Sequence, residues 1–199
     1  MRSNVCKIEN GTKDLAAILD ESERVSKYIG LTDKQSLQLR LICEEIDGML
    51  PNIIDDFEGE LWIDFEDGLC KVNVSVKIPE FNISKKEELI SIAKSKTNSA
   101  AVGLVGKIRN AIENFFLNED AIGAFDASSG AFYLATGYSE GADYSCIWSL
   151  EHYKNTVKKE ACSENWDELE KSVIASVADD VTVCIKGKQA NITIVKKFA

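Results

Sequence analysis

The sequence predicts an α+β two-layer sandwich in which helices cover one face of a mixed, mostly antiparallel sheet. Two stretches, 61–78 and 181–194, alternate apolar and polar residues around a tight turn, which is typical of β-hairpins with one buried face. Other stretches repeat apolar residues at helical spacing, which is typical of amphipathic helices. The order of these elements along 199 residues favours one domain, 1–199, with an extra segment at about 118–178.

The first elements are a short strand and a helix. Residues 4–9 predict the strand, and Asn10-Gly11 predicts a turn after it. Apolar residues at helical spacing then predict a helix over 13–29, which Gly30 ends.

A second helix is predicted from a capping box at its start. Thr32 and Gln35 have the spacing in which each side chain accepts from the other's backbone N–H. Pro51 predicts a kink or an end near Leu50, because proline lacks the N–H that the helix needs. The apolar stripe of this helix consists of Leu39, Ile42, Cys43, Ile46, Met49 and Ile53.

The turns of the two hairpins are Asp67-Gly68 and Gly187-Lys188. Between the hairpins, a second capping box, Ser84-x-x-Glu87, predicts a short helix, and further helices are predicted over 101–116, 149–159 and 165–178. Glycines punctuate residues 118–148, which predicts loops with one or two short strands.

Charge and hydropathy exclude some classes of function. The net charge of −10 argues against nucleic acid or an anionic membrane as the main partner, because both attract lysine and arginine. No stretch approaches the roughly 18 consecutive apolar residues of a membrane span. Residues 1–14 lack the apolar centre of a secretory signal. These observations predict a cytoplasmic protein.

Cysteine and histidine usage gives no metal or catalytic motif. The cysteines are widely spread and form no C-x-x-C pair, so we expect reduced thiols in the core rather than disulfides or a zinc site. His152 is the only histidine, which excludes a mechanism with paired histidines. We expect it at the surface.

The order of motifs resembles the histidine-kinase-like (GHKL, or Bergerat) ATPase fold, and in particular the small bacterial anti-sigma factor serine kinases. LICEEIDGMLPNII resembles the family's Glu-x-x-x-Asn helix, and ELWIDFEDGLCKVNVSVKI resembles the strand pair that follows it. AAVGLVGKIRNAI resembles the second glycine box, and DDVTVCIKGKQANITIVKKF resembles the closing strands. The resemblance covers about residues 5–117 and 179–198.

The resemblance implies an ATP and Mg²⁺ site, but this chain departs from the motif. Glu44 matches the glutamate that acts on water, whereas Gly48 stands where the family has the asparagine that binds Mg²⁺. Asn52 lies one further turn along and is the candidate substitute ligand. Gly48 costs helix stability and predicts a close approach of another backbone.

The glycine boxes are also incomplete. No Asp-x-Gly-x-Gly follows Ile78, so the aspartate that recognises adenine is missing. The second box survives in part as Gly103, Gly106 and Lys107, which could bind a phosphate at a helix N-terminus. The alternative is that these small residues only allow close helix packing.

The charged residues of the second helix have an ordinary interpretation too. Glu44 and Glu45 point about 100° apart and cannot converge on one atom. Arg40 lies one turn before Glu44, where it can form a surface ion pair. Trp62 and Trp166 are interpreted as packing or interface residues.

Three hypotheses of function follow. The first is a bacterial regulatory protein with a degenerate, non-catalytic ATPase-like fold that binds a protein partner, by resemblance a sigma factor or an anti-anti-sigma-like protein. The second is an active ATP-dependent serine kinase or ATPase of the same family, with Glu44, Asn52, Gly103, Gly106 and Lys107 at its site. The third is a small-ligand receptor or enzyme that uses residues 118–150. The resemblance also makes a homodimer one expected arrangement.

Overall fold

The fold is an α+β arrangement of one antiparallel sheet and a layer of helices. The computed structural model describes residues 1–10, 15–54, 56–78, 103–117, 145–160 and 172–198. The strands are β1 (Cys6–Glu9), β2 (Glu58–Glu66), β3 (Leu69–Lys77), β4 (Ser145–Ser149), β5 (Asp180–Lys186) and β6 (Gln189–Lys197). The helices described are α1 (Leu15–Ile29), α2 (Asp33–Ile53), α4 (Gly103–Leu117), α5 (Leu150–Glu160) and α7 (Val173–Val177).

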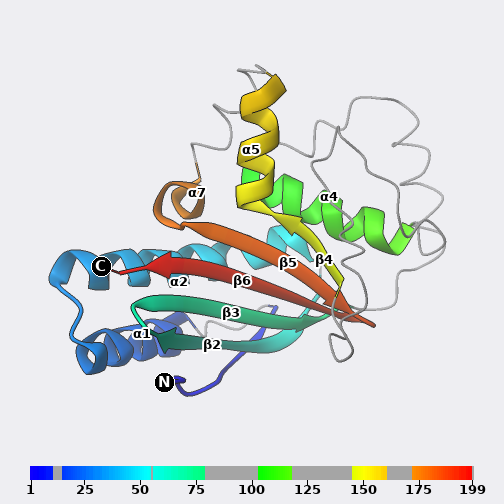
Figure 1. Ribbon diagram of the computed structural model, residues 1–199. Coiled ribbons are helices and arrows are strands. Elements are labelled where there is room, and N and C mark those ends of the chain that lie inside the picture. Colours follow the sequence, from blue (N-terminus) through cyan, green and yellow to red (C-terminus); the bar gives the residue numbers. More distant parts are fainter. Residues whose placement is uncertain (11–14, 55, 79–102, 118–144, 161–171, 199) are drawn as a thin grey trace, which may run out of the picture.

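The sheet combines strands from the N-terminal and the C-terminal parts of the chain (Figure 1). Its strand order is β1-β2-β3-β6-β5-β4, so the hairpin β2–β3 lies beside the hairpin β5–β6. Every pairing among these six strands is antiparallel. The expectation of a mixed sheet is therefore wrong for the described strands. The pairs β2–β3 and β5–β6 come from tight hairpins, which can only be antiparallel.

The two faces of the sheet differ because side chains alternate along each strand. One face is apolar and packs against the helices. Its fully buried members include Leu61, Ile63, Val72, Val74, Val183, Ile192 and Ile194. Helix α2 contributes its predicted stripe to the same core, and α1 packs along α2 on that side. The opposite face is mainly polar.

The predicted turns and the cap of α2 are confirmed. Asp67 and Gly68 have φ values of 49° and 79°, which is the left-handed conformation that the turn of a two-residue hairpin requires. The Gln35 N–H donates to Thr32 Oγ1 over 3.4 Å, and the Thr32 N–H donates to Gln35 Oε1 over 2.9 Å. The capping box therefore starts α2 where the sequence predicts.

Two predicted helices differ in extent from the structure. Helix α2 continues past Pro51 to Ile53, because the Ile54 N–H still donates to the Leu50 carbonyl over 3.0 Å and the single bond lost at Pro51 is tolerated in the last turn. The helix expected over 165–178 is not continuous. Ser172 has an extended backbone and its side chain caps a new short helix, α7. The helix predicted at Ser84-x-x-Glu87 lies outside the described residues.

Candidate functional site

The residues predicted to hold nucleotide on α2 lie along its exposed face. Glu44, Gly48 and Asn52 are one turn apart and are all exposed, because the opposite face of α2 is buried against the sheet. Among the described residues, nothing outside α2 lies within 4 Å of the position that a Cβ would take at Gly48, so none of them makes the close backbone approach that this glycine allows. The Asn52 side-chain amide donates to the Gly48 carbonyl over 3.1 Å. Asn52 thus uses its amide on its own helix.

The ion pair expected at Glu44 is also wrong. Arg40 Nη1 lies 2.6 Å from Glu23 Oε1, so this arginine joins α2 to α1. Geometry explains the choice, since α1 packs against α2 on the side where Arg40 emerges. Glu44 has no hydrogen bond or ion pair within the part of the chain that the structure describes.

The second glycine box forms the start of α4. Gly103 has a φ of 71° and is the first residue of the helix, whereas Gly106 and Lys107 are buried in its first turns. The Lys107 ammonium lies 5.3 Å from the centre of the Tyr153 ring of α5, in a cation–π arrangement. Burial of Gly106 and the position of Lys107 favour the interpretation of this segment as a packing element.

Helix α4 does meet the end of α2. Arg109 Nη1 donates to the Asn52 carbonyl over 3.3 Å. The structure therefore brings the second glycine-box helix to the C-terminal end of the helix that carries Glu44 and Asn52. It does not bring the predicted site residues into one cluster, because Lys107 contacts α5 instead. Within the described residues, no group of three His, Cys, Asp or Glu side chains could hold a metal ion.

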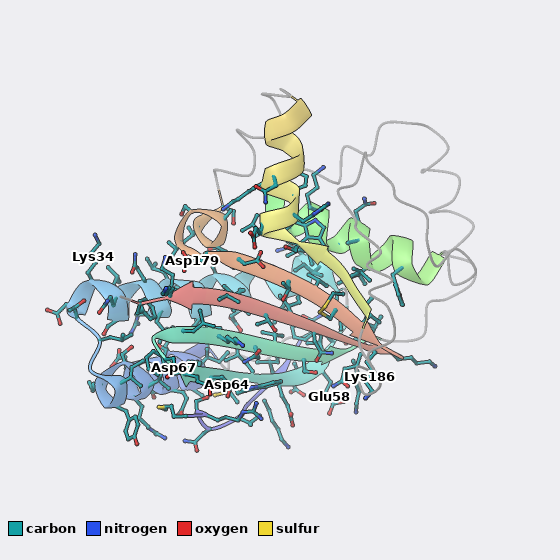
Figure 2. All side chains as sticks on the ribbon, viewed as in Figure 1. Lys34, Glu58, Asp64, Asp67, Asp179 and Lys186 are labelled. Atoms are coloured by element: carbon teal, nitrogen blue, oxygen red, sulfur yellow. A yellow bond between two sulfur atoms is a disulfide. The ribbon has the colours of Figure 1, made fainter. Side chains whose placement is uncertain are left out.

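Sequence reasoning missed a polar network on the open face of the sheet. Asp64 accepts from Arg2 Nε over 2.8 Å, from Trp62 Nε1 over 3.0 Å and from Asn73 Nδ2 over 3.1 Å. Thr193 Oγ1 donates to Asn73 Oδ1 over 3.1 Å, which extends the network to β6. Figure 2 shows Asp64 and Asp67 toward one end of the sheet and Glu58 and Lys186 toward the other.

The charge of Asp64 is stabilised within that network. The hydrogen bond from Arg2 is the main cause that lowers the pKa of Asp64, the Trp62 N–H adds to it, and partial burial opposes both. The Arg2 guanidinium also lies 5.3 Å from the centre of the Trp62 ring. The alternation of apolar and polar residues along β2 could have revealed part of this network, because it places Trp62 and Asp64 on one face of the sheet. The contact with Arg2 crosses 62 residues, and local patterns do not reveal it.

A groove between α1 and α2 is a candidate binding surface for a partner. It has a volume of about 380 Å³ and is lined by Glu23, Ser26, Lys27, Leu31, Asp33, Ser36, Leu37 and Arg40. Leu37 is 55% exposed at its edge. Ser26 is buried, and its hydroxyl has no hydrogen-bond partner among the residues that the structure describes. The groove combines two leucines, Leu31 and Leu37, with polar and charged side chains that include the Glu23–Arg40 ion pair.

A scan against protein-family models, a search of curated proteins and a search of solved structures each found no match. Among the helices described, none is long and apolar enough to cross a membrane.

Proposed function

We propose that this chain is a bacterial regulatory protein with a histidine-kinase-like ATPase fold, and that it acts by binding a protein partner without turning over ATP. One observation carries the proposal. Gly48, which has no side-chain ligand, stands where the family has its magnesium-binding asparagine. Lys107 of the second glycine box lies against the Tyr153 ring of α5, so the residues expected to hold nucleotide do not lie in one cluster.

The arrangement of elements supports the proposed family. Helix α2 precedes the β2–β3 hairpin, and α4 contacts the end of α2 through Arg109 and the Asn52 carbonyl. This is the order in which the family places its glutamate helix, its strand pair and its second glycine box. The same contact favours the second candidate function, an active ATP-binding regulator, because it brings two expected sides of a nucleotide site together.

Nucleotide binding separates these two candidates. We expect no heat when ATP or ADP is titrated into the purified chain by calorimetry, with or without Mg²⁺. Micromolar binding that requires Mg²⁺, together with ATP turnover that Glu44→Ala abolishes, would overturn the proposal in favour of the active regulator. Gln38→Glu is the matched control, since it changes an α2 side chain that belongs to neither site.

Partner binding tests the positive half of the proposal. The probes are purified sigma factors and anti-anti-sigma proteins of the source organism, immobilised for biolayer interferometry. We expect one of them to bind, Leu37→Glu to weaken that binding at least tenfold, and Gln38→Glu and Glu44→Ala to leave it unchanged. A tenfold loss corresponds to about 1.4 kcal/mol, which is typical of one apolar contact at an interface. Failure of every probe to bind would contradict the partner class.

The third hypothesis, a ligand site built by residues 118–150, falls mainly on residues outside the described part of the chain. It stays a prediction.

A further inference from the structure

Two cysteines face each other across the outermost pair of strands. In the β4–β5 register Cys146 lies directly opposite Cys184, and their sulfur atoms form a disulfide. The expectation that all cysteines are reduced core thiols is therefore wrong for this pair. Sequence reasoning missed it because 38 residues separate the two positions and only the strand register brings them together.

The disulfide is accessible to a reagent from solution. Val183 and Ile185 are buried toward the helices, so Cys184 between them points to the opposite, open face of the sheet. Cys146 is exposed, and Cys184 is half-buried. An attacking thiolate must reach one sulfur along the S–S axis, and an exposed cysteine in an edge strand allows this approach.

The other described cysteines do not share this environment. Cys43 and Cys70 are fully buried in the core. Burial raises the pKa of Cys70 to about 12 and raises the pKa of Cys43 still further, so neither forms a thiolate near neutral pH. Cys6 is half-buried in β1, at the opposite edge of the sheet. Thiol–disulfide chemistry in the described residues is thus concentrated at the β4 edge.

The disulfide holds the end of β4 that the backbone ladder holds least. The register shifts between Cys146 and Trp148, so a bulge interrupts the ladder immediately beside Cys146. Beyond the bulge the chain is fixed by other means, because Trp148 and Leu150 are fully buried. Asp180 Oδ1 also accepts from the Glu151 N–H over 2.9 Å, which caps the start of α5 and joins it to β5.

We propose that Cys146–Cys184 is a redox-active site that undergoes exchange with a low-molecular-weight monothiol such as glutathione, and that its reduction releases the Ser145–Cys146 end of β4 while α5 stays in place. A glutathione thiolate attacks Cys146 Sγ and forms a mixed disulfide, and Cys184 leaves as a thiolate that takes up a proton. A second glutathione thiolate attacks the glutathione sulfur and releases the Cys146 thiolate, which is protonated. The products are two protein thiols and one glutathione disulfide. This inference is independent of the proposed function.

Exchange is tested on the full chain in glutathione buffers of graded reduced-to-oxidised ratio. The samples are labelled under native conditions with N-ethylmaleimide and mapped by peptide mass spectrometry. We expect the linked Cys146–Cys184 peptide to disappear as both cysteines become labelled together, with Cys43 and Cys70 unlabelled throughout. Absence of that linked peptide from the oxidised chain, or a link from Cys146 to another cysteine, would overturn the proposal.

Release of the strand end is tested by amide hydrogen exchange on the same samples. Reduction should speed exchange at residues 145–147 by at least tenfold more than at residues 150–155. Equal exchange at residues 145–147 in both redox states, or an increase at residues 150–155 as large as that at residues 145–147, would contradict a local release. The double variant Cys146→Ser/Cys184→Ser should show the reduced pattern at every glutathione ratio, and Cys6→Ser should behave as the wild type. If the double variant does not fold, the reduced wild-type chain gives the same comparison.

Discussion

The two edges of the sheet are held in place by different kinds of contact. At the β1 edge, the chain before β1 continues along β2 through polar contacts. The Ser3 N–H donates to the Ile63 carbonyl over 2.8 Å, and Arg2 pairs with Asp64. At the β4 edge, a short bulged strand is joined to β5 by the Cys146–Cys184 disulfide and by the Asp180 cap on α5. Both devices hold the outermost part of the sheet against the strand beside it.

The contacts at the two edges respond to different changes in solution conditions. The Arg2–Asp64 ion pair at the β1 edge depends on protonation and on salt, whereas the Cys146–Cys184 bond at the β4 edge depends on reductant. The same sheet therefore has an ion pair sensitive to pH at one edge and a covalent bond sensitive to redox state at the other. Each edge can be weakened separately, which makes the comparison testable.

The largest effect on stability is expected when dithiothreitol reduces the disulfide at the β4 edge. The disulfide closes a separation of 38 residues. In the chain-entropy model, a closed loop of that length stabilises the fold by about 4 kcal/mol. Urea unfolding of the oxidised and reduced chains should show this difference in the free energy of unfolding. Cys146→Ser/Cys184→Ser should match the reduced wild type, and equal midpoints for the two redox states would contradict the prediction.

The next effect is expected at Gly59, where β2 lies between β1 and β3. A Cβ at this position would lie 2.3 Å from the Ser75 carbonyl oxygen and 2.7 Å from Val76 Cγ1. Because backbone must move to admit it, Gly59→Ala should destabilise the fold by about 1–3 kcal/mol in urea unfolding. An unchanged free energy of unfolding in Gly59→Ala would mean that β2 and β3 are less closely paired than described.

Gly48→Ala is the matched control for that substitution. Gly48 lies inside α2 with open space beyond it. The same change should therefore stabilise the chain by about 0.5–1 kcal/mol, because alanine loses less backbone entropy than glycine in a helix. Opposite signs for the two alanine variants would confirm that local space, and not residue type, decides the outcome.

Elements with a local signal could be predicted from the sequence. The capping box at Thr32, the turn at Asp67-Gly68 and the apolar stripe of α2 each depend on residues within a few positions of one another, and the structure confirms all three. The α+β class follows from such elements. The antiparallel pairing of every described strand could not be read in the same way, because β3 and β6 meet across more than half of the chain.

The candidate site was less predictable for the same reason. Spacing placed Glu44 and Asn52 on one helix face, but it could not show that the Asn52 amide donates to Gly48 or that Lys107 lies against Tyr153. The disulfide is the clearest case, since the register of β4 against β5 determines it. Long-range contacts of single side chains leave no periodic pattern in a sequence.

A smaller effect is expected from Glu21, which holds the segment before β1 against α1. Glu21 is buried, and its carboxylate accepts from the Asn4 backbone N–H over 2.8 Å. Glu21→Ala should lower the free energy of unfolding by about 1–2 kcal/mol, because a partly buried donor loses its partner. The control is Glu23→Ala, which removes an exposed ion pair with Arg40 and should cost less than about 1 kcal/mol. If Glu21→Ala and Glu23→Ala lowered the free energy of unfolding in urea equally, the role given to Glu21 would be contradicted.

The smallest effect is a pH dependence that comes from Asp64 at the β1 edge. The hydrogen bond from Arg2 lowers the pKa of Asp64 below its usual value of 3.8, so this carboxylate stabilises the fold above that pH and loses its contribution as the pH falls through the folded-state pKa. The midpoint of urea unfolding is measured at a series of pH values below about 4. As the pH falls, this midpoint should decrease less steeply in Asp64→Asn than in the wild type.

High salt should also flatten the wild-type slope, because it screens the exposed ion pair. The free-energy difference between the oxidised and reduced chains should stay constant over the same pH range, since a disulfide does not titrate and the thiols remain protonated there. A wild-type slope that survives in Asp64→Asn, or a redox difference that changes with acid, would mean that the two edges are not independent.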